Sequence, residues 1–144
     1  MGRSLIIALL VLAAVGSSQA AKETVEELAV RAEAARPEDR PGLYIEIAER
    51  QLKNAGQLFG ENKNDQAVNA IRDIATFAEK AHDAAMVARS RLKGTEIALR
   101  KMAAKLRDLK RTLSFEDQTP VQAAADHLEG LRTDLLGQMF GKKK

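Results

Sequence analysis

The chain of 144 residues has no cysteine and no tryptophan, and it has only three prolines, one tyrosine and two histidines. Without cysteine it can have no disulfide, no thiol nucleophile and no lipid-modified N-terminal cysteine. After residue 20 only two serines remain, Ser90 and Ser114, and neither lies in a glycine-flanked turn beside a base. Glycine-rich phosphate loops are also absent. We therefore expect a protein that is not an enzyme, without catalytic or cofactor-binding residues and without a cofactor.

A metal site is not expected either. Glu79 and His82 have the Glu-x-x-His spacing with which helical bundles hold pairs of metal ions. Such sites need two of these motifs and further carboxylates, whereas this chain has the motif once. We interpret Glu79 and His82 as a solvated pair, and His127 beside Asp126 as a surface residue.

The first twenty residues have the pattern of a secretory signal peptide. Arg3 precedes an apolar run over residues 5–15, and the small residues Ser18 and Ala20 suit the positions before a cleavage site. The run is too short to cross a membrane, which takes about 20 apolar residues. We expect residues 1–20 to be removed and the protein to be exported, either to a bacterial periplasm or into the medium. Residues 21–141 then form one helical domain without a transmembrane segment, and residues 142–144 are a basic tail.

Alanine, leucine and charged residues dominate after residue 20, a composition typical of long helices. Strand patterns are absent. A first helix is expected over residues 24–35, where Thr24 and Glu27 have capping-box spacing. A second is expected over 41–59, and a last one from Pro120, capped by Thr119, to residue 140.

Between the second and last helices, apolar residues keep a seven-residue repeat from Ala67 to Leu113, and Thr95 is the one polar residue in it. This repeat is typical of a coiled-coil seam and favours a continuous helix over residues 65–113, roughly 74 Å long. Short turns make sequence neighbours antiparallel. The expected fold is therefore all-α: an elongated antiparallel bundle with one long central helix flanked by shorter helices. The alternative is a break at Gly94, which would fold the chain into a compact four-helix bundle.

One segment resembles a known repeat. The stretch LKNAGQLFGENKNDQAVNAIRDIATFAEKA, residues 52–81, resembles a tetratricopeptide-type hairpin, with Ala55, Leu58 and Ala67 near the small and large positions of that pattern. The resemblance covers one repeat and implies protein binding, not catalysis. The whole chain also resembles short exported helical proteins of bacteria that have no assigned role.

The middle of the repeat is the first candidate site. It uses only alanine, and small side chains let a partner helix approach closely. The flanking helices do not account for this stretch, so it should meet the first helix, a second copy of the chain, or another protein. The principal hypothesis is therefore a non-catalytic envelope scaffold, adaptor or assembly subunit that works by helix–helix association. The residues of this interaction seam are Ala78, Ala81, Ala85 and Ala88.

The second candidate site is the basic segment 89–111, which carries nine Lys or Arg and two acidic residues. It gives an alternative hypothesis, a module that binds anionic lipid head groups or cell-wall polymers. A solvated helix face, partly neutralised by acids of the last helix, explains the same charges. Nucleic acid is not expected as a partner, because the protein is exported and only Phe115 is near for stacking on bases. The possible anion-binding residues are Arg100, Lys101, Lys105, Arg107, Lys110 and Arg111.

Overall fold

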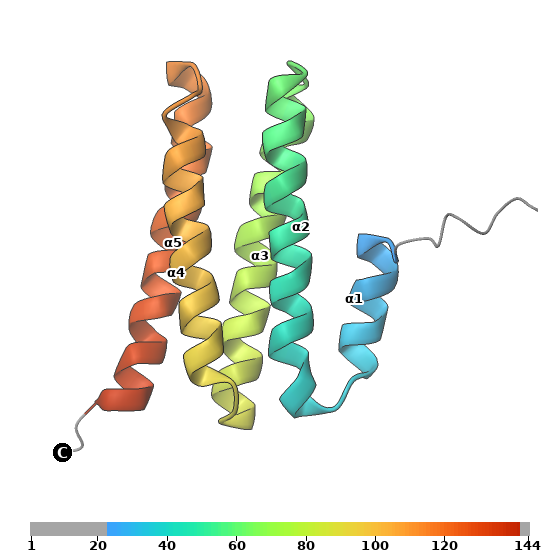
Figure 1. Ribbon diagram of the computed structural model, residues 1–144, viewed down its shortest axis with the longest axis vertical. Coiled ribbons are helices and arrows are strands. Elements are labelled where there is room, and N and C mark those ends of the chain that lie inside the picture. Colours follow the sequence, from blue (N-terminus) through green and yellow to red (C-terminus); the bar gives the residue numbers. More distant parts are fainter. Residues whose placement is uncertain (1–22, 142–144) are drawn as a thin grey trace, which may run out of the picture.

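The computed structural model describes residues 23–141, and this part of the chain is all-α, as expected, with no strand. Five α-helices pack as an antiparallel bundle (Figure 1). A short 3₁₀ turn, η2, separates the first two helices. The elements are α1 (Val25–Ala34), η2 (Pro37–Asp39), α2 (Arg40–Gly60), α3 (Asn64–Ala88), α4 (Leu92–Lys110) and α5 (Phe115–Phe140).

Two helical hairpins stand side by side and make up most of the molecule. The helices α2 and α3 form one hairpin, and α4 and α5 form the other. Both hairpins run in the same direction, so α2 is parallel to α4 and α3 is parallel to α5 (Figure 1). The contact between the hairpins is more extensive between α3 and α5 than between α2 and α4. The ribbons of α2 and α4 diverge toward the turns at residues 61–63 and 111–114 (Figure 1).

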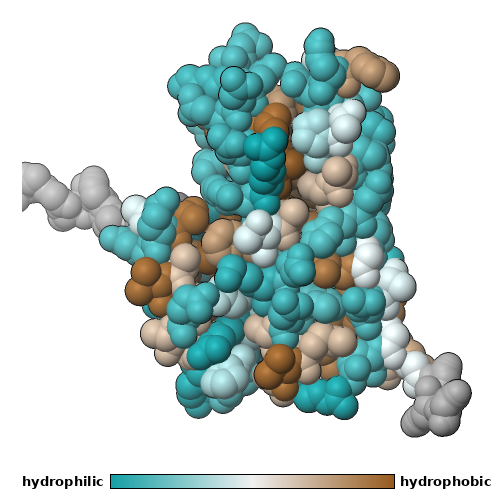
Figure 2. Space-filling view, turned by 180° about the vertical axis from the view of Figure 1, so that it is seen from behind, coloured by the Kyte–Doolittle hydropathy of each residue, from teal (hydrophilic) through white to brown (hydrophobic). Residues whose placement is uncertain are grey.

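The core lies between these hairpins and follows the apolar periodicity of each helix. Side chains that are fully or almost fully buried come from α2, α3, α4 and α5, and large ones such as Ile47, Ile74, Leu106 and Leu128 lie along the whole length of the bundle. Seen from behind, apolar residues appear between the two hairpins in the upper half of the molecule, while further apolar residues lie on the lower flank beside the N-terminal end (Figure 2). Burial of this apolar surface drives the association of the four long helices.

The first helix packs on the outside of α2 and not across the alanine-rich part of α3. Leu28 and Ala32 of α1 are fully buried in this contact. The capping box predicted at its start is present, because the Thr24 hydroxyl accepts a hydrogen bond from the Glu27 amide at 3.0 Å and the Glu27 carboxylate accepts one from the Thr24 amide at 3.0 Å. The two bonds satisfy backbone donors that the helix itself leaves free.

The prediction of a continuous helix over residues 65–113 is wrong. The chain turns at residues 89–91, where Arg89 and Arg91 have left-handed backbone angles, with φ of 57° and 60°. The turn lies just before Gly94, close to the break that the alternative placed there. The seven-residue repeat keeps its phase across the turn because α3 and α4 bury the same heptad positions in one core. Met102 and Leu106 are two of these buried positions in α4. Folding back lets α5 and α2 cover α4, which an isolated rod would leave exposed.

The last helix begins at Phe115, five residues before the predicted start, so Thr119 and Pro120 lie inside it. Ser114 takes the N-cap position, and its hydroxyl donates a hydrogen bond to the Asp117 carboxylate at 3.0 Å. The acidic residues Glu116 and Asp117 in the first turn favour a helix start there through the helix dipole. The expected signal peptide and basic tail lie outside the described residues.

Candidate functional site

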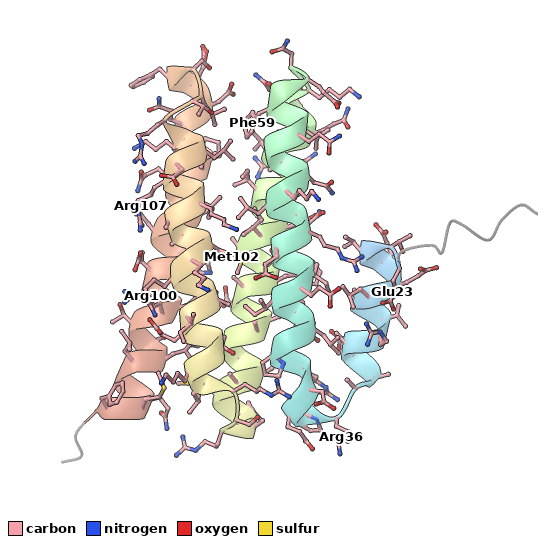
Figure 3. All side chains as sticks on the ribbon, in the orientation of Figure 1. Glu23, Arg36, Phe59, Arg100, Met102 and Arg107 are labelled. Carbon is pink, nitrogen blue, oxygen red and sulfur yellow. The ribbon has the colours of Figure 1, made fainter. Side chains whose placement is uncertain are left out.

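The six candidate anion-binding residues of α4 and the turn after it fall into two groups. Four of them have partners within the chain. Arg107 pairs with Glu129 at 3.0 Å, Arg100 lies 3.4 Å from Glu96, and Lys110 donates to the side-chain oxygen of Gln122 at 2.8 Å. Arg111 pairs with Asp108. Arg100 and Arg107 extend from the side of α4 nearer to α5 (Figure 3). A cation that is already paired within the chain has less to gain from an external anion.

Lys101 and Lys105 differ from these four residues. Both are exposed, and neither has an ion pair or hydrogen bond with any described residue. They are four positions apart, so their side chains lie on one face of α4. On that face they border a groove between α4 and α2, to which α2 contributes a third exposed lysine, Lys53. Lys53 likewise has no ion pair within the described residues, so three free ammonium groups border one depression.

The groove has a volume of about 490 Å³ and an apolar floor. Met102, only 2 % exposed, extends from α4 toward α2 (Figure 3), and Leu52 of α2 is half-buried. Glu49 also lines the groove, so its formal charge from three lysines and one glutamate is +2. The volume lies within the range of small-molecule sites, which combine apolar walls with a few polar groups. We call this depression the lysine groove, lined by Glu49, Leu52, Lys53, Lys101, Met102 and Lys105.

A second, smaller depression lies between the same two helices, centred about two helical turns closer to their N-terminal ends. Its volume is about 200 Å³, and small and apolar residues provide most of its wall. In sequence, Ala98 is one turn before Lys101 and Met102, and Ile45 is one turn before Glu49. We call it the small-residue groove, lined by Gly42, Ile45, Arg91, Gly94, Thr95 and Ala98.

A buried ionic network explains why Arg100 and Arg107 are turned toward α5. Glu96 of α4 is only 5 % exposed, and Arg132 of α5 donates to its carboxylate at 2.7 Å. Arg132 also donates to Glu129 at 3.1 Å. The hydrogen bond to Glu96 raises the pKa of Arg132, so this guanidinium keeps its charge. The sequence suggested that acids of the last helix partly neutralise the basic segment, and Glu129 has this role.

The alanines of the predicted interaction seam are covered within the chain. Ala78, Ala81 and Ala85 are fully buried, whereas Ala88 at the end of α3 is half-buried. The helices that contact α3 most are α2 and α5, not α1. Three of the four seam residues therefore belong to the protein's own core and present no surface to a partner.

Glu79 and His82 do not form the solvated pair that the sequence suggested. Glu79 pairs with His127 of α5 at 3.0 Å. His82 is nearly buried, with its Nδ1 2.8 Å from Asp83 and its Nε2 3.3 Å from Asp134 of α5. The contact to Asp134 lacks hydrogen-bond geometry, so His82 Nε2 has no hydrogen-bond partner among the described residues. Within residues 23–141, no three His, Asp or Glu side chains are grouped closely enough to hold a metal ion.

Sequence reasoning missed one polar cluster, which joins α1, α2 and α3. The Tyr44 hydroxyl of α2 donates to the Glu33 carboxylate of α1 at 2.5 Å, and Lys80 of α3 lies 3.8 Å from that carboxylate and 5.8 Å from the centre of the tyrosine ring. Burial, followed by the hydrogen bond to Glu33, raises the pKa of Tyr44 to about 12. These groups satisfy one another and connect α1 to the bundle.

No helix within residues 23–141 combines the length and the apolar character that a membrane span requires. No family model matches the chain, and neither a curated protein nor a solved structure shows significant similarity to it.

Proposed function

We propose that this chain is a non-catalytic, exported binding protein, and that its lysine groove binds an anionic partner from the cell envelope. The observation that carries the proposal is the contrast on α4: its arginines are paired within the chain, while Lys101 and Lys105 are free and face Lys53 of α2. Three unpaired ammonium groups around one groove repel one another, and an anion placed between them removes that repulsion. Envelope lipids and cell-wall polymers supply such anions.

The test is sedimentation with vesicles, using protein purified after expression of the full chain. Vesicles that contain phosphatidylglycerol should sediment the protein, and vesicles of phosphatidylcholine alone should not. Raising the salt from about 0.05 M to about 0.5 M should release it, because screening shortens the reach of exposed charges. Each lysine near an anionic surface contributes about 1 kcal/mol, so Lys53→Gln, Lys101→Gln and Lys105→Gln together should weaken binding at least tenfold.

The control removes the same charge elsewhere. Arg36, Lys63 and Arg111 are exposed and lie outside the lysine groove, with ion pairs only to acids close in sequence. The triple variant Arg36→Gln, Lys63→Gln, Arg111→Gln should bind nearly as well as the unmodified protein. Equal losses in the two triple variants would mean that net charge, and not the groove, determines binding.

A second candidate function is an adaptor that binds another protein, and the stacking of the hairpins favours it. Two hairpins that run in the same direction resemble the arrangement of helical-repeat proteins, and the α2–α3 hairpin includes the segment that resembles a tetratricopeptide-type repeat. Stacked repeats of such proteins form extended surfaces that bind other proteins. Val30 on α1, 70 % exposed, adds apolar surface beside the first hairpin. Crosslinking in cells from position 30 would test it, with a specific partner adduct as the expected result and none as the contrary one.

A further inference from the structure

We infer that the lysine groove and the small-residue groove together bind a single-chain anionic amphiphile, with its carboxylate among the lysines and its alkyl chain along the α2–α4 junction. This inference rests on the proposed function and names the ligand class. It follows from the order of the two grooves along the helices: three lysines border the first, whereas the second has small and apolar residues and one arginine, Arg91, which lies 3.8 Å from Asp39.

The head-group end is the lysine groove. Lys101 and Lys105 approach it from α4 and Lys53 from α2, so a carboxylate can accept hydrogen bonds from two helices at once. Glu49 on the same rim lowers the formal charge of the groove from +3 to +2, which suits a small anion better than a highly charged polymer. A ligand with one negative charge fits this rim better than a polyanion does.

The alkyl end begins at the floor of the same groove. Leu52 and Met102 give the first apolar contacts below the lysines. One turn further along the helices, Ile45 and Ala98 line the small-residue groove. Ile45 is 8 % exposed, so most of its surface already lies in the core and what remains faces the junction.

The small-residue groove gives the alkyl chain room next to the backbone. Added Cβ atoms at Gly42 and Gly94 would meet no neighbour within 4 Å, as at the other helical glycines, so a ligand can approach the backbone at both positions. From Lys105 back to Gly94 the helix rises roughly 16 Å, so the path suits an extended chain and not a compact head group alone.

The shape lets a flat bilayer contact the rim of the lysine groove but not fill the depression. The free lysines surround a depression whose floor residue Met102 is 2 % exposed, so a planar surface would contact the rim and leave the floor empty. A single chain fills both parts of the junction. An acidic protein segment would contact the lysines of the rim and would not depend on an alkyl chain. The dependence of affinity on alkyl chain length therefore distinguishes the two kinds of ligand.

The experiment is calorimetric titration of the protein with octanoate, decanoate and dodecanoate, each below its micelle concentration. We expect binding to strengthen about two- to fourfold per added methylene, since full burial of a methylene corresponds to about fourfold. Acetate and dodecyltrimethylammonium, which lack the chain and the negative charge respectively, should bind at least tenfold more weakly than dodecanoate.

Two variants locate the ligand. Lys53→Gln, Lys101→Gln and Lys105→Gln together should weaken dodecanoate at least tenfold. Ala98→Leu fills the small-residue groove and should weaken dodecanoate about fivefold while leaving octanoate unchanged. Ala104→Leu, an exposed position on the same helix outside both grooves, is its matched control. Should a variant fail to fold, the chain-length series of the unmodified protein still decides the question.

Equal affinity for octanoate and dodecanoate, or for dodecanoate and its cationic counterpart, would overturn the inference. If vesicle binding still depended on the three lysines, a general anion-binding role would stand without the amphiphile. If neither vesicles nor carboxylates bound in a lysine-dependent way, the proposed function would fail together with this inference.

Discussion

Arg100 and Lys101 are adjacent in the sequence, yet they serve different interactions. Arg100 is directed to the buried carboxylate of Glu96, whereas Lys101 borders the lysine groove without a partner among the described residues. Their side chains point in different directions because successive helical positions are about 100° apart around the axis. Of the six candidate residues, pairing within the chain leaves Lys101 and Lys105 without partners among the described residues, and the fold brings Lys53 to the same groove.

Tyr44 allows a direct test of the α1 contact, because it is the one tyrosine and the chain has no tryptophan. Its pKa is raised to about 12. Below pH 10 both folded and unfolded states keep the proton, so the full stabilisation is present; it declines as pH rises from about 10 toward 12, where only the unfolded state has lost the proton. Near-ultraviolet absorbance of the phenolate should therefore titrate near pH 12 in the native protein and near 10 in denaturant.

The variant Glu33→Gln controls this measurement. It keeps the side-chain size and removes the charge that accepts the hydrogen bond from the tyrosine hydroxyl. The native titration should then move down toward the ordinary tyrosine value. A midpoint near 10 in the unmodified native protein would contradict the Tyr44–Glu33 contact.

Arg132 tests the ionic network between α4 and α5. Arg132→Met leaves the carboxylate of Glu96, 5 % exposed, with Arg100, at 3.4 Å, as its one remaining cationic partner among residues 23–141. Because an uncompensated buried charge is strongly unfavourable, Tm should fall on the order of 10 °C in thermal unfolding followed by circular dichroism. Adding Glu96→Gln should recover part of the loss. Arg111→Met, which removes an exposed pair, should have little effect, and a similar loss in both variants would argue against the network.

At the scale of elements, the turn at residues 89–91 decides the architecture. It lies between two helices with one shared heptad phase, and two of its three residues are arginines in the left-handed region. L-residues other than glycine adopt this region at a cost of about 1 kcal/mol, and glycine is usual at the position that ends a helix. The turn is therefore held by the packing of the hairpins and not by its own sequence.

The variant Arg89→Gly should relieve that strain. We expect the free energy of unfolding in urea to rise by about 0.5–1 kcal/mol, because glycine adopts φ of 57° freely. Lys93→Gly, inside α4, should lower it by about 1 kcal/mol. If Arg89→Gly were as destabilising as Lys93→Gly, residue 89 would be helical in solution, as the continuous-helix interpretation requires.

Sequence patterns predicted the helices better than their connections. Capping at Thr24 and the prolines Pro37 and Pro41 on either side of the start of α2 are local signals, and both helices start within a residue of the expected place. The turn at 89–91 has no such signal, since Gly94 lies inside α4 and the heptad phase reports the buried face only. Lys53 could not be assigned to the site, because it lies 48 residues before Lys101 and reaches the groove only through the stacking of hairpins.

At the scale of the whole molecule, the alanine seam no longer requires a partner. Ala78, Ala81 and Ala85 are fully buried by helices of the same chain. We therefore expect light scattering to give the mass of a monomer at every concentration across about a hundredfold dilution, since no uncovered seam remains to drive self-association. A stable dimer over that range would show that copies associate through another surface, with the exposed Val30 as the first position to examine.

The central claim is that the free lysines between α2 and α4 form the binding surface. The most direct test is a nuclear magnetic resonance titration of the labelled protein with dodecanoate, followed through backbone amide shifts. The account predicts saturable shifts in residues 49–53 of α2 and 98–105 of α4, with small changes at Arg111 and along the outer face of α1. Shifts spread over all cationic residues, or centred away from α2 and α4, would contradict it.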